Sequence, residues 1–303
     1  MATKKYMVVI AGPTAVGKTA IGIALARHFG SVILSGDSRQ FYRQTNIGTA
    51  KPDTEELAEV RHYFINSLSI EQDYTAGDFE RDALLLAEHL FIQHDILFVV
   101  GGSGLYLQAL CEGLDHFPNT DAAVRASLVA DYEREGIAFL RQELQRRDPV
   151  CYQNIDLHNP QRIMRALEVC ISTGLPYSSF LTKPAIKRPF EILKIGLSMD
   201  KQILHERINK RIDGMIQAGL VDEVRALYPY RHYNALQTVG YKELFAHFDG
   251  TCTLAQAIEQ IKINTRQYAK RQMTWFKKYG DWTWFEPTDL ENIVTWVVNS
   301  VTF

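Results

Sequence analysis

The sequence predicts an α/β fold, in which a parallel sheet core is flanked by helices and carries an all-helical insertion domain. Three observations lead to this prediction. Apolar, β-branched runs at 7–11, 31–34 and 95–100 are each followed by a glycine-containing loop and then by apolar residues at helical spacing. From 118 to 189, by contrast, the pattern is helical and bounded by prolines. We therefore expect a core of residues 1–117 and 190–303 and an insertion of residues 118–189.

Composition favours a soluble cytoplasmic protein over a secreted or membrane protein. The 303 residues are enough for one large domain with a smaller insertion, and the net charge of −2 predicts no overall affinity for nucleic acid. The cysteines are scattered, without metal-ligand or disulfide spacing, and no apolar run reaches membrane length. We expect a cytoplasmic monomer without a membrane partner. The cysteines, expected to be reduced, are Cys111, Cys151, Cys170 and Cys252.

The first expected strand ends in a phosphate-binding pattern. GPTAVGKT at 12–19 fits G-x-x-x-x-G-K-[ST] between a strand and a helix, which makes the core a P-loop fold. The glycines let backbone N–H groups turn inward, Lys18 supplies a cation, and the Thr19 hydroxyl can ligate Mg²⁺. The alternative is a glycine-rich turn with a solvated lysine. The expected phosphate-binding residues are Gly12, Pro13, Thr14, Ala15, Val16, Gly17, Lys18 and Thr19.

The second strand, 31–34, leads into SGDSRQFY at 35–42. Because the ends of parallel strands gather at one edge, this loop should lie beside the phosphate loop. Its Asp37 could bind magnesium, accept a proton or cap the next turn, and spacing alone leaves all three open. The strand at 95–100 ends in glycines instead of the acid that usually holds magnesium in nucleoside triphosphatases, which disfavours triphosphate hydrolysis.

The insertion begins with a charged helical hairpin at 121–147, with Gly136 in its turn. A later helix carries Arg162 and Arg165 on one face, where they could either bind a ligand or be solvated. After the insertion, a strand at 191–197 precedes a helix with Arg207 and Arg211 one turn apart. Such a pair suits a diphosphate, although surface arginines that form ion pairs with nearby acids are the plainer explanation.

The longest helical pattern, 253–279, is strongly basic. No acid occurs between residues 260 and 280, and aromatic residues alternate with the cations. This combination suits a nucleic-acid backbone and its unstacked bases, while the alternative is a lysine-rich amphipathic helix. The cations are Lys262, Arg266, Lys270, Arg271, Lys277 and Lys278, and the expected packed face is Ile258, Ile261, Thr265, Tyr268, Gln272 and Trp275.

These stretches together resemble the bacterial tRNA dimethylallyltransferases, an isopentenyl-transfer family that modifies the adenosine beside the anticodon. The resemblance covers almost the whole chain, but Ser103 replaces a usual threonine and Asn159 a frequent aspartate. It rests on GPTAVGKT at 12–19, SGDSRQFYR at 35–43, NIGTAKP at 46–52, TAGDF at 75–79, GGSGLYLQAL at 101–110, NPQRIMRALEV at 159–169, VGYKEL at 239–244 and TRQYAKRQMTWFKK at 265–278.

The resemblance implies transfer of a dimethylallyl group from dimethylallyl diphosphate to N6 of adenosine 37 in the tRNA anticodon stem-loop, with Mg²⁺. The phosphate loop and Arg211 would hold the diphosphate, Asp37 would be the general base, and Thr19 would place the metal. The insertion would contact the anticodon loop. The implied tRNA contacts are Asp37, Ser38, Arg39, Gln40, Ser103, Arg125, Gln161, Arg162, Ile163, Met164, Arg165, Gln237, Thr238, Val239, Gly240, Tyr241, Lys242, Lys270, Arg271, Gln272, Trp275 and Lys277.

Three other functions stay open at this point. An isopentenyltransferase acting on free AMP or ADP would share the phosphate loop and Asp37, but would have little use for Arg162, Arg165 and the basic helix. A small-metabolite P-loop kinase is disfavoured by the glycines after the strand at 95–100. A non-catalytic RNA-binding module would not need the pair Lys18 and Thr19.

Overall fold

The computed structural model describes residues 4–181 and 186–301 and divides into two compact units. The core unit comprises 1–112 and 187–303, and the helical unit comprises 113–186. The second boundary lies before the expected one because Arg188 is anchored in the core. Its buried guanidinium pairs with Glu80 at 2.6 Å and donates to the carbonyls of Ala109 and Leu110 at the end of a core helix.

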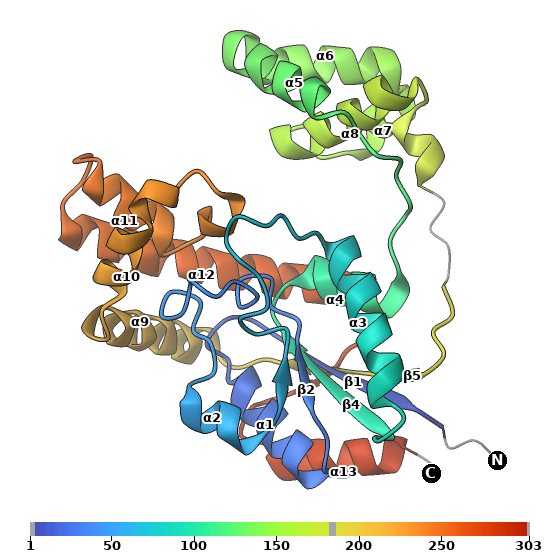
Figure 1. Cartoon of the computed structure of the whole chain (residues 1–303), viewed down its shortest axis with the longest axis vertical. Coiled ribbons are helices and arrows are strands. Elements are labelled where there is room, and N and C mark those ends of the chain that lie inside the picture. Colours follow the sequence, from blue (N-terminus) through green and yellow to red (C-terminus); the bar gives the residue numbers. More distant parts are fainter. Residues whose placement is uncertain (1–3, 182–185, 302–303) are drawn as a thin grey trace. The chain divides into compact units, whose positions relative to one another are not determined.

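The described residues form a six-stranded parallel sheet in the order β3-β2-β4-β1-β5-β6 (Figure 1). The strands are β1 (Tyr6–Ala11), β2 (Ile33–Ser35), β3 (His62–Tyr63), β4 (Ile96–Gly101), β5 (Glu191–Leu197) and β6 (Thr283–Phe285). β3 covers only the first two residues of a partly apolar run at 62–68 in the sequence. Phe64 and Asn66 adopt positive φ angles of 62° and 57°, which end the extended conformation.

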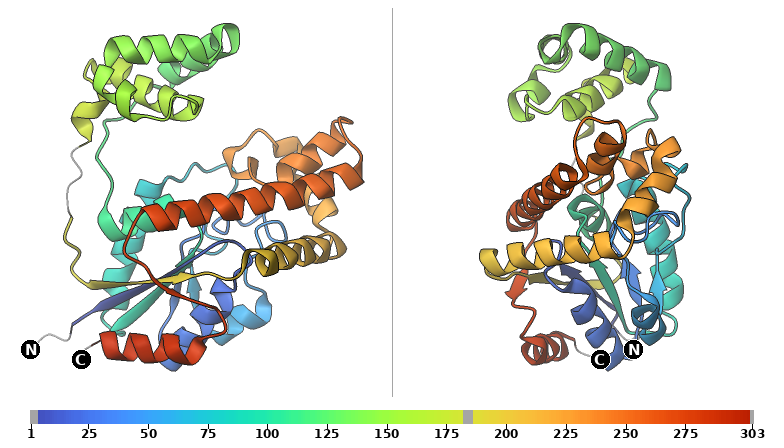
Figure 2. Two further views of the ribbon diagram at one scale, coloured as in Figure 1. Left: turned by 180° about the vertical axis from the view of Figure 1, so that it is seen from behind. Right: turned by 90° about the vertical axis from the view of Figure 1, so that its left-hand side faces the viewer.

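Helices cover both faces of this sheet, as Figures 1 and 2 show. The helices of the core unit are α1 (Lys18–His28), α2 (Thr54–Glu59), α3 (Ala76–Leu90), α4 (Gly104–Glu112), α9 (Lys201–Gln217), α10 (Leu220–Leu227), η2 (Tyr228–Tyr230), η3 (Asn234–Leu236), α11 (Tyr241–Phe248), α12 (Leu254–Lys278) and α13 (Leu290–Ser300). α3 and α12 each begin at a capping box, formed by Thr75 and Thr253.

The two faces of β1 belong to two separate hydrophobic cores. Tyr6, Val8 and Ile10 pack with α1, α9 and α13, whereas Met7 and Val9 pack with α3 and α4. This alternation is the period-two pattern of a strand that is buried on both faces. The apolar run after residue 6 therefore forms the centre of a three-layer α/β arrangement, and its carboxyl end carries the phosphate loop.

The helical unit has its own core, built around Leu128, Leu140 and Leu144. Its hairpin is as expected, with Gly136 at φ 73° between α5 and α6. Asn159 caps α8 by accepting the amide of Arg162 at 3.2 Å. The elements are α5 (Ala122–Glu135), α6 (Ile137–Arg147), α7 (Pro149–Asn154), α8 (Pro160–Thr173) and η1 (Tyr177–Phe180). In neither described unit is a helix both long and apolar enough to cross a membrane.

Candidate active site

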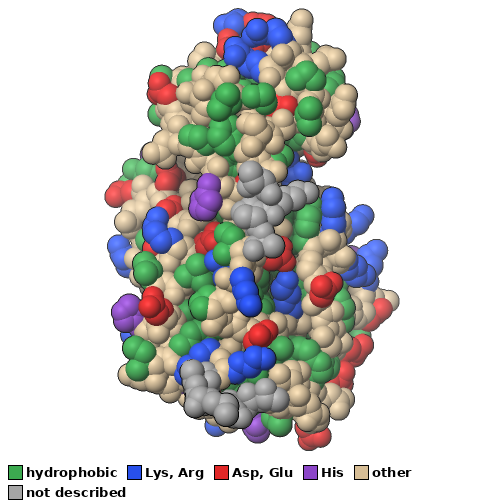
Figure 3. Space-filling view, turned by 90° about the vertical axis from the view of Figure 1, so that its right-hand side faces the viewer, with side chains coloured by type: hydrophobic (Ala, Val, Ile, Leu, Met, Phe, Trp, Pro, Cys, Tyr) green, Lys and Arg blue, Asp and Glu red, His purple; other side chains and the backbone are tan. Residues whose placement is uncertain are grey.

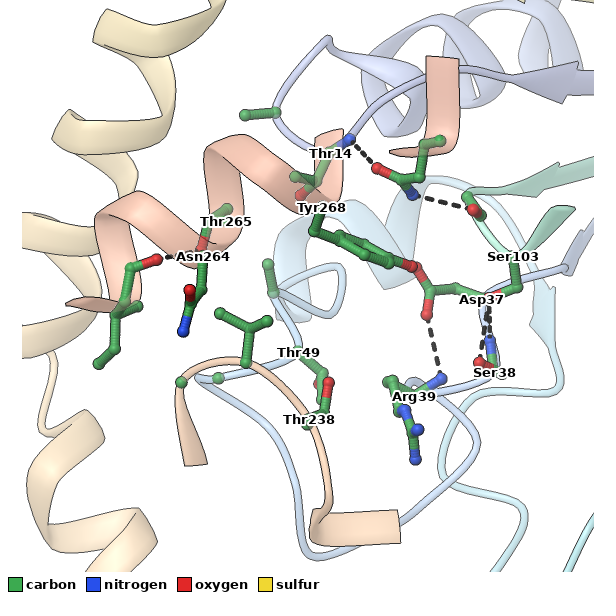
Figure 4. Close-up of a pocket in the computed structure, with 18 of the residues that line it drawn as sticks. Thr14, Asp37, Ser38, Arg39, Thr49, Ser103, Thr238, Asn264, Thr265 and Tyr268 are labelled. Carbon is green, nitrogen blue, oxygen red and sulfur yellow. Dashed lines mark hydrogen bonds between the residues drawn. The ribbon is translucent and has the colours of Figure 1, made fainter. Parts of the chain in front are cut away.

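A cavity of about 760 Å³ opens at the carboxyl edge of the sheet in the core unit. Its walls come from the loops that follow β1, β2 and β4 and from α9, α12 and the segment before α11, as Figure 4 shows in part. The structure therefore brings together many of the expected site residues. Those that line the cavity are Thr14, Ala15, Asp37, Ser38, Arg39, Ser103, Arg211, Gln237, Thr238, Val239, Gly240, Lys242, Arg271, Gln272 and Trp275.

The phosphate loop has the backbone that the motif requires. Gly12 has a φ of 154°, and a Cβ there would lie 2.6 Å from the carbonyl oxygen of Leu197. Gly17, at φ 111°, precedes the first residue of α1. Ala15 also has a positive φ of 65°, which is unfavourable for a residue with a side chain and is typical of a functional loop. The loop amides and the amino end of α1 thus form a concave donor surface.

Lys18 lies inside this loop, and its charge interacts with the charges of Asp37 and Arg211. Its Nζ donates to the carbonyls of Gly12 and Pro13 at 3.0 and 2.8 Å. Burial lowers its pKa to about 8, the carboxylate of Asp37 opposes this shift, and the guanidinium of Arg211 adds to it. Burial also lowers the pKa of Arg211, again opposed by Asp37. The charges of one carboxylate and two cations are therefore coupled within the site.

Asp37 fills one of the three roles that spacing left open, that of a cap. Its Oδ1 accepts the backbone amide of Arg39 at 3.0 Å, so the residue does cap a turn. Within the described residues Oδ2 accepts no hydrogen bond and is available for a proton. Figure 4 shows the Tyr268 ring pointing toward Asp37. Burial and the negative charge of Asp37 raise the pKa of Tyr268, so its hydroxyl stays protonated.

The strand order puts β4 between β1 and β2, so the Asp37 loop faces the phosphate loop across the end of β4. Gly101 permits this arrangement, because a Cβ there would lie 2.2 Å from the carbonyl oxygen of Gly36. Ser103 then joins the segment after β4 to the Asp37 loop. Its Oγ accepts the amide of Ser38 at 2.9 Å and donates to the Ser38 hydroxyl at 3.0 Å. The glycines at the end of β4 therefore allow close packing. They also stand where nucleoside triphosphatases usually carry a metal-binding acid.

Two residues of the second loop are used to build the cavity wall. Arg39 donates to the carbonyls of Asn234 and Ala235 at 3.0 and 3.2 Å. Gln40 accepts the hydroxyl of Ser35 at 3.0 Å and donates to the carbonyl of Ala50. Their side chains fix loops around the cavity, although the sequence predicted them as contacts to RNA.

The basic residues of α12 fall into two groups. Lys262 pairs with Asp213 at 2.6 Å, and Arg266 contacts Glu259 at 3.5 Å, so both are used within the core unit. The others are exposed. On the face in Figure 3, Lys and Arg side chains are interspersed with Asp and Glu. The cations left to meet a polyanion are Lys270, Arg271, Lys277 and Lys278.

The structure decides between the two explanations for Arg211. The nearby acid Asp213 pairs with Lys262 instead. Arg211 forms no ion pair within the described residues, and its Nη2 donates to the Ala50 carbonyl at 3.4 Å. It is a half-buried cation facing the cavity, so the surface ion pair is excluded for this residue. Arg207, the other arginine of the pair, is exposed, and its Nη2 lies 3.6 Å from where a Cβ on Gly17 of the phosphate loop would be.

Burial corrects three of the expected RNA contacts. Tyr241 is fully buried, and its hydroxyl donates to Glu223 at 2.6 Å. Ile163 and Met164 are 0% and 2% exposed and belong to the core of the helical unit. Their side chains therefore cannot reach an RNA in this structure. Motif resemblance does not separate residues that contact a ligand from residues that hold the contacting ones in place.

In the helical unit, the expected contacts Arg125 and Arg165 converge on Glu168, which is 3% exposed. Arg125 donates to it at 2.5 Å and to Gln161 at 2.7 Å, and Arg165 donates to it at 3.3 Å. Arg162 is exposed. The two arginines are thus held by a buried carboxylate while 42% and 43% of their side-chain surfaces stay accessible. This is an ordered basic surface rather than a set of freely solvated side chains.

Known proteins resemble this chain in sequence and in fold. Residues 40–279 match a family described as IPP transferase. The tRNA dimethylallyltransferase of Christiangramia forsetii is 50% identical over 93% of each chain, and that of Flavobacterium johnsoniae is 48% identical over 98% of each. Among solved structures, a tRNA isopentenylpyrophosphate transferase from Bacillus halodurans has a TM-score of 0.73 and 34% identity, covering 98% of this chain and 96% of its own. A eukaryotic dimethylallyltransferase acting on tRNA has a TM-score of 0.77 and 27% identity, covering 95% and 75%.

Proposed function

The chain belongs to the IPP transferase family, and on this premise we propose that it transfers the dimethylallyl group of dimethylallyl diphosphate to N6 of adenosine 37 in tRNA. The observation that carries the proposal is the cavity that Asp37 and Arg211 line together with the phosphate loop. This arrangement puts a candidate base opposite a candidate leaving-group site. The relatives named as tRNA dimethylallyltransferases support the choice of RNA as the acceptor.

The phosphate end of the site would stabilise the leaving diphosphate. As the bond between C1 of the dimethylallyl group and the bridging oxygen breaks, negative charge develops on the diphosphate. Lys18, Arg211 and the amides of the loop supply positive charge and N–H donors from a partly dehydrated site, where such interactions are strongest.

Asp37 would act at the other end of the transferred group. The exocyclic N6 is a weak nucleophile because its lone pair is conjugated with the purine. It attacks C1 when it is held in line and loses a proton as the N–C bond forms. The free Oδ2 of Asp37 would take that proton, while the bond from the Arg39 amide to Oδ1 holds the carboxylate in orientation.

We also propose that the donor binds with Mg²⁺ and that the Thr19 hydroxyl is its protein ligand. The described residues contain no group of three or more His, Cys, Asp or Glu side chains able to hold a metal. A single hydroxyl together with substrate oxygens suits magnesium, which is commonly shared between a protein and a phosphate. When bound, the ion would neutralise diphosphate oxygens.

The RNA would be held outside this cavity by the exposed cations of α12 and the arginine surface of the helical unit. The adenosine has to leave its stack to reach a carboxylate inside the cavity, as in other enzymes that act on bases. We propose that the enzyme acts as a monomer, because a single chain supplies Thr14 of the phosphate loop, Asp37 and Arg211 to the proposed site. A tRNA substrate favours the cytoplasm as the place where it acts.

The test is a labelling experiment with three acceptors. The protein is incubated with ¹⁴C-dimethylallyl diphosphate and Mg²⁺, and with tRNA, AMP or ADP separately; a parallel reaction offers γ-labelled ATP. We expect label only in tRNA, at N6 of adenosine 37 after nuclease digestion. Label in AMP or ADP and not in tRNA, or phosphate transfer from ATP, would overturn the proposal.

A further inference from the structure

Gln272 joins helix α12 to the two loops that form the phosphate end of the site. Its side-chain Oε1 accepts the backbone amide of Thr14 at 2.8 Å, and its Nε2 donates to the carbonyl of Gly102 at 2.8 Å. One amide group thus connects the phosphate loop after β1 with the end of β4. The three segments are far apart in the sequence, and this side chain bonds them to one another.

The surroundings of Gln272 show that the bridge is built into the fold. The residue is 6% exposed, so its hydrogen bonds are protected from water. A Cβ on Gly102 would lie 2.4 Å from Nε2 of Gln272 and 3.6 Å from Nζ of Lys18. Glycine at this position therefore makes room for both the bridging amide and the phosphate-loop lysine. Both polar atoms of Gln272 are already used within the protein, which makes it a poor candidate for an RNA contact.

The residues next to Gln272 on α12 line the cavity. Arg271 and Trp275 line it, and Tyr268, one turn earlier, points toward Asp37. Trp275 is in turn packed against Gly104, where a Cβ would lie 2.2 Å from its ring. The segment of α12 that would meet the RNA is therefore the segment that holds the phosphate loop through Gln272.

We propose that Gln272 is a positioning residue that couples RNA binding on α12 to diphosphate binding in the phosphate loop. This inference rests on the proposed function, because it takes RNA and a diphosphate as the two ligands. RNA held by Arg271 and Trp275 restrains α12, and the bond from Gln272 to Thr14 then restrains the loop. A loop that is already ordered binds the diphosphate with a smaller loss of conformational entropy. By linkage, the diphosphate must strengthen RNA binding by the same factor.

The experiment measures this coupling without the transfer reaction. Isothermal titration gives the Kd of inorganic diphosphate with Mg²⁺ in the absence and presence of a saturating anticodon stem-loop RNA. Gln272→Met removes both hydrogen bonds at nearly constant volume, and Gln272→Leu removes them with a different shape. Gln267→Met is the matched control, because Gln267 is an exposed residue on the same helix. Thermal melts establish that each variant is folded.

In the wild type and in Gln267→Met we expect RNA to lower the diphosphate Kd about five-fold or more, within the usual range of coupling between sites. In both Gln272 variants the ratio of the two Kd values should fall to within two-fold of one, while RNA still binds. The inference is wrong if the variants keep the wild-type ratio, or if RNA leaves the diphosphate Kd of the wild type unchanged. Because no group is transferred, failure of the labelling experiment and failure of this one are separate results.

Discussion

The hydroxyl of Tyr241 donates a hydrogen bond of 2.6 Å to the carboxylate of Glu223. The same carboxylate accepts the backbone amides of residues 46, 47 and 48 at 2.8 to 3.1 Å. The Tyr241 ring also fills the space beside Gly48, where a Cβ would lie 2.6 Å from it. The loop held in this way continues into Thr49 and Ala50, which line the cavity beside Arg211. Glu223 and Tyr241 thus support one wall of the site from behind.

Tyr241→Phe should therefore destabilise the protein without weakening RNA binding. The change removes one hydrogen bond to a half-buried carboxylate, and we expect the free energy of unfolding to fall by about 1–2 kcal/mol in urea titrations. The Kd for an anticodon stem-loop should stay within two-fold of the wild type, because the side chain is fully buried. A ten-fold loss of RNA affinity at unchanged stability would show that the hydroxyl reaches the RNA.

Asp37→Asn should abolish the chemical step and spare binding. An asparagine carbonyl can still accept the Arg39 amide, so the turn is retained, but the side chain cannot take the N6 proton. We expect single-turnover transfer to fall by roughly two orders of magnitude or more, with RNA and diphosphate affinities within a few-fold. Asp222→Asn on α10, where the carboxylate is exposed, is the control. Wild-type transfer rates in Asp37→Asn would remove Asp37 from the role of base.

Much of the core could be predicted from local patterns. The phosphate loop, the capped starts of α3 and α12, and the hairpin of the helical unit each depend on a few adjacent residues. The family resemblance, now supported by relatives about half identical in sequence, added the acceptor. These features are encoded locally or in ordered motifs, so one sequence is enough to find them.

The support of the site could not be predicted in the same way. Glu223 and Gln272 act on backbone groups more than a hundred residues away, and no spacing rule connects them with residues 46–48 or Thr14. The apolar run at 62–68 was likewise no guide to β3, because positive φ angles end that strand. Whether a motif residue faces a ligand or its own core depends on tertiary packing, as Tyr241 shows.

Diphosphate binding should weaken as the pH rises through about 8. Burial lowers the pKa of Lys18 to about 8, so the side chain is charged below this pH and loses its proton above it. Without the charge, attraction for the diphosphate falls, and we expect about ten-fold weaker binding at pH 9 than at pH 7. Lys18→Met should bind weakly at every pH and should lack the decrease that comes from deprotonation of Lys18. The ligand titrates in the same way with both proteins, so a difference between the two pH profiles reports on Lys18. Parallel pH profiles of the two proteins in calorimetric titrations would contradict the assignment.

Glu168→Gln should loosen the arginine surface of the helical unit. The glutamine keeps the shape but loses the charge that holds Arg125 and Arg165. We expect a loss of about 1–3 kcal/mol in stability, followed by denaturant titration, and several-fold weaker RNA binding. Glu143→Gln in the same unit is the control, because 23% of the Glu143 side-chain surface is exposed, compared with 4% for Glu168. Equal effects of the two substitutions would show that burial of Glu168 has no special role.

The salt dependence of RNA binding tests which cations of α12 meet the phosphates. Lys270, Arg271 and Lys277 are exposed and form no ion pair within the described residues, whereas Lys262 is held by Asp213 at 2.6 Å. Replacing the first three by glutamine should reduce the slope of log Kobs against log salt by about 0.7–0.9 for each phosphate that is no longer neutralised. Lys262→Gln should leave the slope unchanged, because its charge is already neutralised. A triple variant with the wild-type slope would place the RNA on another surface. The slope reports only how many cations meet phosphates and release counterions.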